Sequence, residues 1–425
     1  MNGVKTLIKG ARVIDPASGR FETGDIYIEG SRITAVDKAI RVSGATVIEA
    51  GGLYAAPGLV DMHVHLRDPG QTDKEDIATG CRAAAAGGFT SIAAMPNTIP
   101  VADCADVIRY MINRAAGAGV RVYPIAAVTL GQEGCELTDF EELSAAGAVA
   151  FSDDGRPVMS AAIMAKAMKA AADLGKLVIS HCEDQTLAGG IINEGAISAR
   201  LGVKGLPAAA EEVQVARETA LAASYGQPVH IAHVSTALSV ALIRDAKRRG
   251  VKVTCETCPH YFSLDESYTL SRDADYRMNP PLRTKADVEA IIEGLRDGTI
   301  DAIVTDHAPH TAQEKADFET APNGATGLET SLAAGLTYLV RPGHLTVSQL
   351  IAKMSANPAR ILKLEAGTLG VGSPADITLF DPDEKWIVRP EDMRSKSRNT
   401  PYKGMYLYGH VKYTICNGNI VFSVE

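Results

Sequence analysis

The chain has 425 residues, more than one hydrophobic core usually accommodates, so we expect one large domain and a smaller one. Its 46% hydrophobic and 22% charged residues are ordinary for a globular enzyme and argue against disorder. A net charge of −9, with no run of Lys or Arg, argues against a nucleic-acid-binding surface.

The seven cysteines are scattered and odd in number, which is typical of reduced thiols. Cys255 and Cys258 form the only close pair, and no second pair follows at zinc-ribbon spacing. We therefore interpret this pair as the end of a strand. The N-terminal stretch lacks the layout of a signal peptide, and no window of 18 residues is continuously apolar. These features predict a soluble cytoplasmic protein without a membrane-spanning segment.

Residues 1–56 contain short alternating apolar runs separated by turn residues, which predicts a small antiparallel sheet. From residue 57 the pattern changes to strands that alternate with helices, and it continues to about residue 365. Eight apolar runs predict strands at residues 59–65, 90–95, 120–128, 148–153, 177–181, 229–233, 251–256 and 302–306. Helical apolar periodicity occurs at residues 161–174, 209–224, 237–249 and 285–297.

Eight strands alternating with helices predict an α/β fold, a (β/α)8 TIM barrel, over residues 57–365. A doubly wound open sheet is the alternative, but no Gly-x-Gly-x-x-Gly follows an early strand. Residues 366–425 are again strand-rich, and Asn417-Gly418 is a strong hairpin signal. The first and last strands of a barrel are neighbours, so we expect residues 1–56 and 366–425 to form one composite β-sandwich.

Two histidines, His63 and His65, end the first barrel strand on the same face. Alone, they fit two hydrogen-bonded core histidines as well as a metal site. The ends of the other strands favour the metal, because four histidines and two aspartates at equivalent positions are hard to explain by packing. Six such ligands fit two metal ions roughly 3.5–4 Å apart, bridged by a carboxylate and a hydroxide. The expected ligands are His63, His65, Asp153, His181, His233 and Asp306.

Several motifs resemble the bacterial class I dihydroorotases of the amidohydrolase superfamily. They are DMHVHLRDPG (residues 61–70), MPNT (95–98), FSDDG (151–155), MNPPLR (278–283) and TDHAPH (305–310), with SANPAR (355–360) and GSPAD (372–376) in the flanking region. The metal motif is typical of the whole superfamily, whereas MPNT and MNPPLR indicate the family.

The resemblance implies a zinc ion held by His63, His65, Asp153 and Asp306, and a second held by Asp153, His181 and His233. It also implies that Asp306 is the catalytic general acid and base, and that the substrate is bound by His65, Arg67, Asn97, Asn279 and His310. The residue types agree with these roles, since Arg suits a carboxylate and Asn suits a ring that carries both N–H and C=O groups.

The implied reaction is the reversible cyclisation of N-carbamoyl-L-aspartate to L-dihydroorotate in de novo pyrimidine (UMP) biosynthesis. In the hydrolytic direction a metal-bridging hydroxide would attack the ring amide, and Asp306 would pass the proton to the leaving nitrogen. One loop departs from the family, which commonly has an aromatic residue before a glycine where this chain has Asn323 and Gly324. Backbone contacts from these two residues to the substrate remain possible, but aromatic packing does not.

Many binuclear relatives bridge their metals with a carbamylated lysine at the end of the fourth strand. Residues 147–155 contain no lysine, so we expect a carbamate-free site in which Asp153 is the bridge. Asp154 is the competing candidate, but strand alternation would turn it to the opposite face.

Two other functions are open. A dihydropyrimidinase, hydantoinase or allantoinase would use the same metals, but their substrates lack the ring carboxylate that Arg67 would bind. A non-catalytic scaffold for aspartate transcarbamoylase would be expected to lose ligands, and all six positions are filled. A homodimer and an association with that enzyme are possible partnerships.

Overall fold

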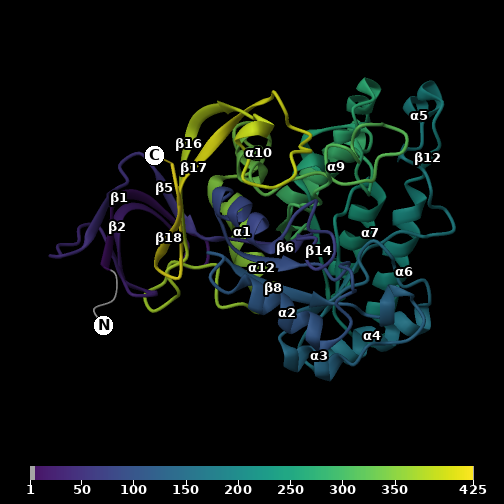
Figure 1. The fold of residues 1–425 in the computed structure, drawn as a ribbon, viewed down its shortest axis with the longest axis horizontal. Coiled ribbons are helices and arrows are strands. Elements are labelled where there is room, and N and C mark those ends of the chain that lie inside the picture. Colours follow the sequence, from purple (N-terminus) through teal and green to yellow (C-terminus); the bar gives the residue numbers. More distant parts are fainter. Residues whose placement is uncertain (1–4, 425) are drawn as a thin grey trace.

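The barrel predicted for the middle of the chain is present in the computed structural model, which describes residues 5–424 (Figure 1). Its eight strands pair in parallel, each with the next along the chain. All eight predicted strands are confirmed, most with shorter ends. They are β6 (Leu59–Val64), β7 (Phe89–Ala94), β8 (Arg121–Ala126), β9 (Ala150–Phe151), β10 (Val178–Ser180), β13 (Val229–Ile231), β14 (Val253–Thr257) and β15 (Ala302–Ile303).

The ring closes between its first and last strands. Val64 forms a parallel bridge with His307, and the backbone N–H of His65 donates to the carbonyl of His307 at 2.8 Å. Closure excludes the doubly wound open sheet, so the predicted fold class is confirmed. It also brings residues that follow β6 beside residues that follow β15, at the carboxyl ends of the strands.

Helices cover the outside of the barrel (Figure 1). The four predicted helices are confirmed within one residue at each end, and Ser160, Thr236 and Thr284 cap the N-termini of three of them. The α-helices are α1 (Ile77–Ala86), α2 (Ala105–Ala115), α3 (Phe140–Ala146), α4 (Ala161–Asp173), α5 (Ala196–Leu201), α6 (Ala209–Tyr225), α7 (Ala237–Arg248), α8 (Pro259–Ser263), α9 (Lys285–Arg296), α10 (Ser331–Gly335), α11 (Val347–Ile351) and α12 (Asn357–Leu362). Short helical segments are η1 (Leu130–Gln132), η2 (Glu266–Ser271), η3 (Ala274–Tyr276), η4 (Leu336–Val340), η5 (Ala352–Ala356) and η6 (Pro390–Asp392).

The two flanks share one sheet beside the barrel, in the order β18-β17-β16-β5-β1-β2-β3, with β4 also paired to β1 (Figure 1). The Asn417-Gly418 hairpin is confirmed, and both residues have positive φ. The strands are β1 (Lys5–Asp15), β2 (Arg20–Glu29), β3 (Arg32–Asp37), β4 (Thr46–Glu49), β5 (Tyr54–Pro57), β16 (Ile377–Ile387), β17 (Tyr406–Cys416) and β18 (Asn419–Ser423). A separate two-stranded pair joins β11 (Ile192–Asn193) and β12 (Gly205–Leu206).

The N-terminal flank differs from the expected antiparallel sheet in one respect. The strands β4 and β5 pair with β1 in parallel, because the connections from β3 to β4 and from β4 to β5 keep the chain direction that β3 shares with β1. The apolar residues 55–60, which precede His63, are divided between the two sheets: β5 belongs to the flanking sheet and β6 to the barrel. Pro57 ends β5, and at Gly58 a Cβ would lie 2.2 Å from the Thr90 hydroxyl, so only glycine fits where the chain enters the barrel.

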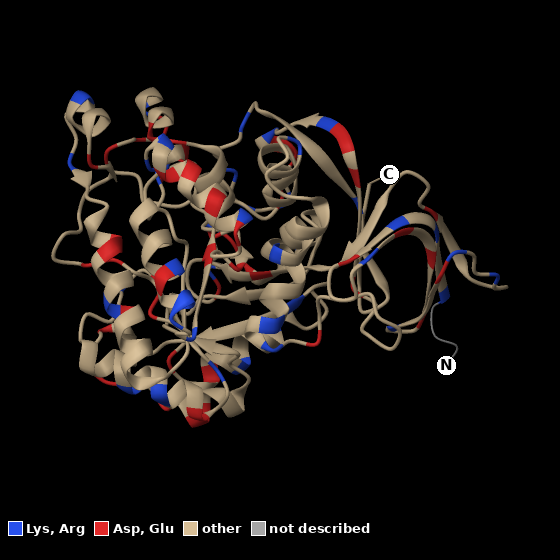
Figure 2. Ribbon diagram, turned by 180° about the vertical axis from the view of Figure 1, so that it is seen from behind, with Lys and Arg blue, Asp and Glu red and all other residues tan. Residues whose placement is uncertain are grey.

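The predicted domain boundaries stay predictions, and residues 1–4 and 425 of the predicted flanks lie outside the described residues. Cys255 and Cys258 are buried free thiols at the end of β14, as expected for a strand end. Among residues 5–424, no helix has the length and apolarity needed to span a membrane. Figure 2 shows Lys and Arg mixed with Asp and Glu over the outer helices.

Candidate metal centre and substrate cavity

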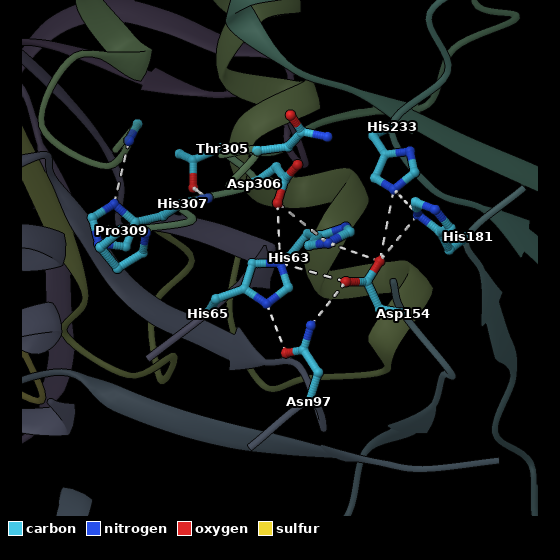
Figure 3. A network of polar contacts seen from close by, with 12 residues as sticks. His63, His65, Asn97, Asp154, His181, His233, Thr305, Asp306, His307 and Pro309 are labelled. Carbon is cyan, nitrogen blue, oxygen red and sulfur yellow. Dashed lines mark hydrogen bonds and ion pairs between the residues drawn. The ribbon is translucent and has the colours of Figure 1, made fainter. Parts of the chain in front are cut away.

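Four histidines and two aspartates converge at the carboxyl ends of the barrel strands (Figure 3). His63 lies on β6, and the others lie one to three residues after the ends of their strands. Beyond a strand end the side chains no longer alternate between the two faces of the sheet, so neighbouring residues can both turn toward the centre. Nδ1 of His181 lies 2.7 Å from Nε2 of His233, and Nε2 of His65 lies 3.1 Å from an Asp306 oxygen. All are buried.

Asp154, and not Asp153, is the aspartate that faces these histidines. Its carboxylate lies 3.4 Å from His63 Nε2, and the corresponding distances to His65, His181 and His233 are 3.5, 3.5 and 3.6 Å (Figure 3).

The prediction that Asp153, and not Asp154, faces the metal ligands is therefore wrong. Its carboxylate accepts hydrogen bonds from the backbone N–H of Val128 at 2.8 Å and of Thr129 at 3.2 Å, and from the Thr129 hydroxyl. The reason is that β9 ends at Phe151, so the alternation of a strand does not extend to these aspartates.

The donor set fits divalent metal ions. Two groups of three ligands have all their ligand atoms within 4.8 Å of one another: His63, Asp154 and His233, and His63, His65 and Asp306. Nε2 of His63 and Oδ1 of Asp154 are buried without a hydrogen-bond partner among the described residues. Leaving such atoms unpaired is costly, and imidazole and carboxylate together are typical ligands of zinc.

The same charges control the protonation of the site. Burial raises the pKa of Asp306, but the facing His63 and His65 outweigh it and lower that pKa to about 2. Burial lowers the pKa of His63, but Asp154 and Asp306 outweigh it and raise that pKa well above its ordinary value. A cation at this site would compete with protons for the same nitrogen atoms, so its affinity should increase with pH.

A second layer of residues orients His63 from behind. Its Nδ1 lies 2.8 Å from one oxygen of Glu256, whose other oxygen lies 3.0 Å from Nε2 of His230. All three residues are fully buried. A carboxylate on the far nitrogen fixes the ring so that Nε2 can bind a metal. Glu256 was not among the predicted site residues, although its position at the end of the seventh predicted strand was a usable signal.

A cavity of about 240 Å³ opens beside the cluster. All seven residues predicted to bind substrate line it: His65, Arg67, Asn97, Asn279, His310, Asn323 and Gly324. Asp154, His181, His233 and Asp306 line it as well, whereas Asp153 is not among its lining residues. A small molecule in this cavity would therefore contact both the candidate metal ligands and the polar side chains around them.

The guanidinium of Arg67 places a positive charge at this cavity. No carboxylate among the described residues forms an ion pair with it. Its Nε donates to the carbonyl of Pro309 at 3.2 Å, and its Nη2 lies 3.3 Å from Nε2 of His310. That His310 nitrogen must carry the proton, because it donates to the carbonyl of Asn323 at 2.9 Å. Burial and the Arg67 cation lower the pKa of His310 to about 3, so the ring is neutral at pH 7.

The two asparagines approach from different sides. The side-chain oxygen of Asn97 accepts a hydrogen bond from Nδ1 of His65 at 2.8 Å, and its amide nitrogen is 3.5 Å from Asp154 (Figure 3). The amide nitrogen of Asn279 donates to Glu183 at 2.7 Å. Burial raises the pKa of Glu183, but His181 and Asn279 outweigh it and lower that pKa to about 2. Glu183 was also missed by the sequence analysis, although it lies only two residues after His181.

The loop that departs from the family pattern is held by its backbone. The N–H of Gly324 donates to Arg277 at 2.9 Å, and its carbonyl accepts from Asn399 at 3.0 Å. Gly324 has a φ of 137°, a conformation that favours glycine, and a Cβ there would lie 2.7 Å from the Ala308 carbonyl oxygen. These contacts hold the backbone of the loop at the cavity, which Asn323 and Gly324 line.

Three non-glycine residues of the site have left-handed backbone conformations. The φ angles are 58° for Arg67, 29° for His233 and 46° for Asp306. Such conformations are costly outside glycine and cluster at functional sites, where the surrounding structure imposes them.

Comparisons with known proteins agree with this geometry. The family model described as "Dihydro-orotase-like" matches residues 52–239, and the one described as "Amidohydrolase family" matches residues 160–422. The dihydroorotase of Acetivibrio thermocellus is 53% identical over 418 residues, which cover 98% of each chain. The dihydroorotase of Pelotomaculum thermopropionicum is 51% identical, again over 98% of each chain.

Solved structures of similar fold carry other names. An L-hydantoinase from Arthrobacter aurescens has a TM-score of 0.89 at 26% identity, covering 100% of this chain and 96% of its own. A dihydropyrimidinase from Brevibacillus agri has a TM-score of 0.86 at 26% identity, covering 99% and 95%. Identity to the dihydroorotases is about twice as high over nearly the same length, and the chain therefore belongs to the dihydroorotase family of the amidohydrolase superfamily.

Proposed function

We propose that the chain catalyses the reversible, zinc-dependent cyclisation of N-carbamoyl-L-aspartate to L-dihydroorotate. The observation that carries this proposal is Arg67, a half-buried guanidinium that lines the cavity without a carboxylate partner among the described residues. Burying a cation is costly unless a partner compensates it, and a planar fork of N–H donors matches a carboxylate. Both L-dihydroorotate and N-carbamoyl-L-aspartate carry the required carboxylate, whereas hydantoin and allantoin do not.

Two zinc ions are proposed, with Asp154 as the protein bridge and no carbamylated lysine. His63, His65 and Asp306 would hold one ion with Asp154, and His181 and His233 would hold the other with Asp154. Bound there, the ions would supply an activated water and a polarised carbonyl oxygen. The support is the set of buried, unpaired ligand atoms and the four histidine contacts of Asp154.

Asp306 is proposed to move the proton. Its low pKa keeps it ionised at neutral pH, so it can take a proton from the attacking water. In ring opening the bond between the ring nitrogen and its carbonyl carbon breaks, and Asp306 returns the proton to that nitrogen. In ring closure the same carboxylate removes a proton from the carbamoyl nitrogen as that nitrogen bonds to the side-chain carboxyl carbon, and it passes the proton to the departing oxygen, which leaves as water. Asp306 and Arg67 line one cavity, so a substrate anchored by its carboxylate could present its amide to Asp306.

Hydrolysis of a neutral cyclic amide is the second candidate, and the TM-score of 0.89 to a hydantoinase is the observation that favours it. The zinc-loaded protein should be assayed for ring opening of L-dihydroorotate, hydantoin, dihydrouracil and allantoin. The proposal expects dihydroorotate to be hydrolysed with the highest kcat/KM by at least an order of magnitude. Preference for hydantoin or dihydrouracil would reject it in favour of the second candidate.

Three other expectations stay predictions: a homodimer, an association with aspartate transcarbamoylase, and a cytoplasmic location. Purification of the chain with and without that partner enzyme would test the first two.

A further inference from the structure

We propose that Glu183 is a positioning residue that fixes the orientation of the Asn279 side-chain amide, so that Asn279 presents a hydrogen-bond acceptor to the substrate. This inference deepens the proposed function and rests on it. Glu183 is not among the residues lining the substrate cavity, whereas Asn279 is. Glu183 would therefore act on the substrate only through its neighbour.

The contact between the two residues is short and directional. Nδ2 of Asn279 lies 2.7 Å from Oε2 of Glu183, and Glu183 is only 8% exposed. The other carboxylate oxygen, Oε1, accepts from the side-chain amide of Gln185 at 2.8 Å, and Gln214 donates to the Glu183 carbonyl at 3.3 Å. Gln185 and Gln214 thus fix Glu183 in place independently of its contact with Asn279.

The chemistry of the pair decides which way the amide of Asn279 points. An amide has a donor end and an acceptor end of nearly the same shape, whereas an ionised carboxylate can only accept. Only the NH2 group of Asn279 can therefore face Glu183. Its Oδ1 is left for the cavity, with no protein partner among residues 5–424. A substrate ring N–H fits this acceptor, and the reversed amide would offer that N–H a donor instead.

The proposed role of Glu183 can be tested by exchanging the carboxylate of Glu183 and the amide of Asn279, singly and together. In Glu183→Gln, the amide oxygen should stay beside Gln185, so the new NH2 group faces Asn279 and favours the reversed amide. In Asn279→Asp, two carboxylates meet at about the same distance. In the double variant, the introduced aspartate can accept from the introduced glutamine with one oxygen and present the other to the substrate. The pair keeps one charge and regains its acceptor in the cavity.

The measurement is KM and kcat for L-dihydroorotate in the zinc-saturated wild type, both single variants, the double variant, and the neighbouring control Asp184→Asn. We expect KM to rise about 10-fold in Glu183→Gln with a smaller change in kcat. It should rise at least as much in Asn279→Asp, and return to within a few-fold of wild type in the double variant. The control should match the wild type, since among residues 5–424 the Asp184 carboxylate accepts hydrogen bonds only from the backbone N–H and hydroxyl of Thr186.

Zinc content of each variant separates this inference from a role through the metal, because Oε2 of Glu183 also lies 3.8 Å from His181 Nε2. A loss of activity in Glu183→Gln that followed zinc loss alone would overturn the inference. A double variant no better than the worse single variant would overturn it too, as would an unchanged KM in Glu183→Gln. If the wild type itself did not act on L-dihydroorotate, the proposed function would fail instead, and the two failures are therefore distinguishable.

Discussion

The mouth of the barrel and the sheet made by the two flanks bury different kinds of side chain. The mouth buries four histidines and several carboxylates, with atoms of His63 and Asp154 left unpaired. The core cluster of the flanking sheet is entirely aliphatic, with residues such as Ile26 and Ile377 fully buried. Unpaired buried polar atoms reduce stability, so the polar residues of the mouth are explained by the ligands they bind. The aliphatic residues of the flanking core are explained by the stability that their burial provides.

The comparison predicts that substitutions at the mouth change chemistry and metal binding, whereas substitutions in the flanking core change stability alone. The largest effect is expected for Asp306→Asn, which keeps the shape but removes the proton acceptor. We expect kcat to fall roughly 10³- to 10⁴-fold, with the folding midpoint of the protein little changed. Steady-state kinetics and a denaturation curve on the same sample check both parts. A kcat within tenfold of wild type would remove Asp306 from the proton transfer.

A smaller loss is expected for Arg67→Lys, which keeps the charge but loses the two-pronged guanidinium. We expect kcat/KM for L-dihydroorotate to fall about 100-fold while zinc content is kept. Metal analysis beside the kinetics checks that the change is confined to substrate binding. Near-normal kinetics would show that Arg67 does not bind the substrate carboxylate.

In the flanking core, Ile26→Val removes one buried methylene group from β2. We expect a loss of about 1 kcal/mol in the free energy of unfolding, and unchanged kcat and KM. Val47→Ala is the matched control, because Val47 on β4 is 47% exposed and should cost less. If Ile26→Val lowered kcat in proportion to stability, the two regions would not be separable in this way.

An effect on stability that depends on pH is expected for Glu329, which lines a cavity between the barrel and the strands β16 and β17. Burial raises the pKa of Glu329 to about 7, although backbone N–H groups of Arg394 and Ser395 donate to it. The folded state then binds this proton more tightly than the unfolded state, so Glu329 lowers stability as pH rises from about 4.5 to about 7.

The variant Glu329→Gln lacks this titration. Relative to the wild type, its denaturation midpoint should therefore move upward between pH 5 and pH 8, while kcat at pH 8 stays the same. Denaturation curves of both proteins at the two pH values provide the measurement. A difference between the two midpoints that did not change with pH would contradict the raised pKa.

Much of this architecture follows from local sequence patterns. The eight strands and the four long helices were predictable because their apolar periodicity is strong and each is bounded by turn or capping residues. The parallel pairing of β4 and β5 with β1 was not, because pairing partners depend on contacts between distant segments.

The site shows a similar division. The residue types and strand ends predicted the histidines and Asp306, whereas the substrate-binding residues that line the cavity were implied by the family resemblance. The choice between Asp153 and Asp154 depended on whether the fourth strand continued past Phe151, and a shift of one residue turns the side chain to another face. Glu183 and Glu256 lie near predicted strand ends, which was a usable signal. Their partners Asn279 and His63 are distant in sequence, however, and no local pattern reveals such contacts.

Asp154 is proposed to join the two groups of metal ligands, and the number of zinc ions bound per chain tests this assignment. Metal-stripped wild type, Asp154→Asn and Asp153→Asn should be reconstituted with zinc in the absence of bicarbonate, and bound zinc measured after removal of excess. The account predicts two zinc ions in the wild type, a deficit with loss of activity in Asp154→Asn, and near-wild-type zinc in Asp153→Asn. Full zinc in Asp154→Asn with a deficit in Asp153→Asn, or a requirement for bicarbonate, would contradict it.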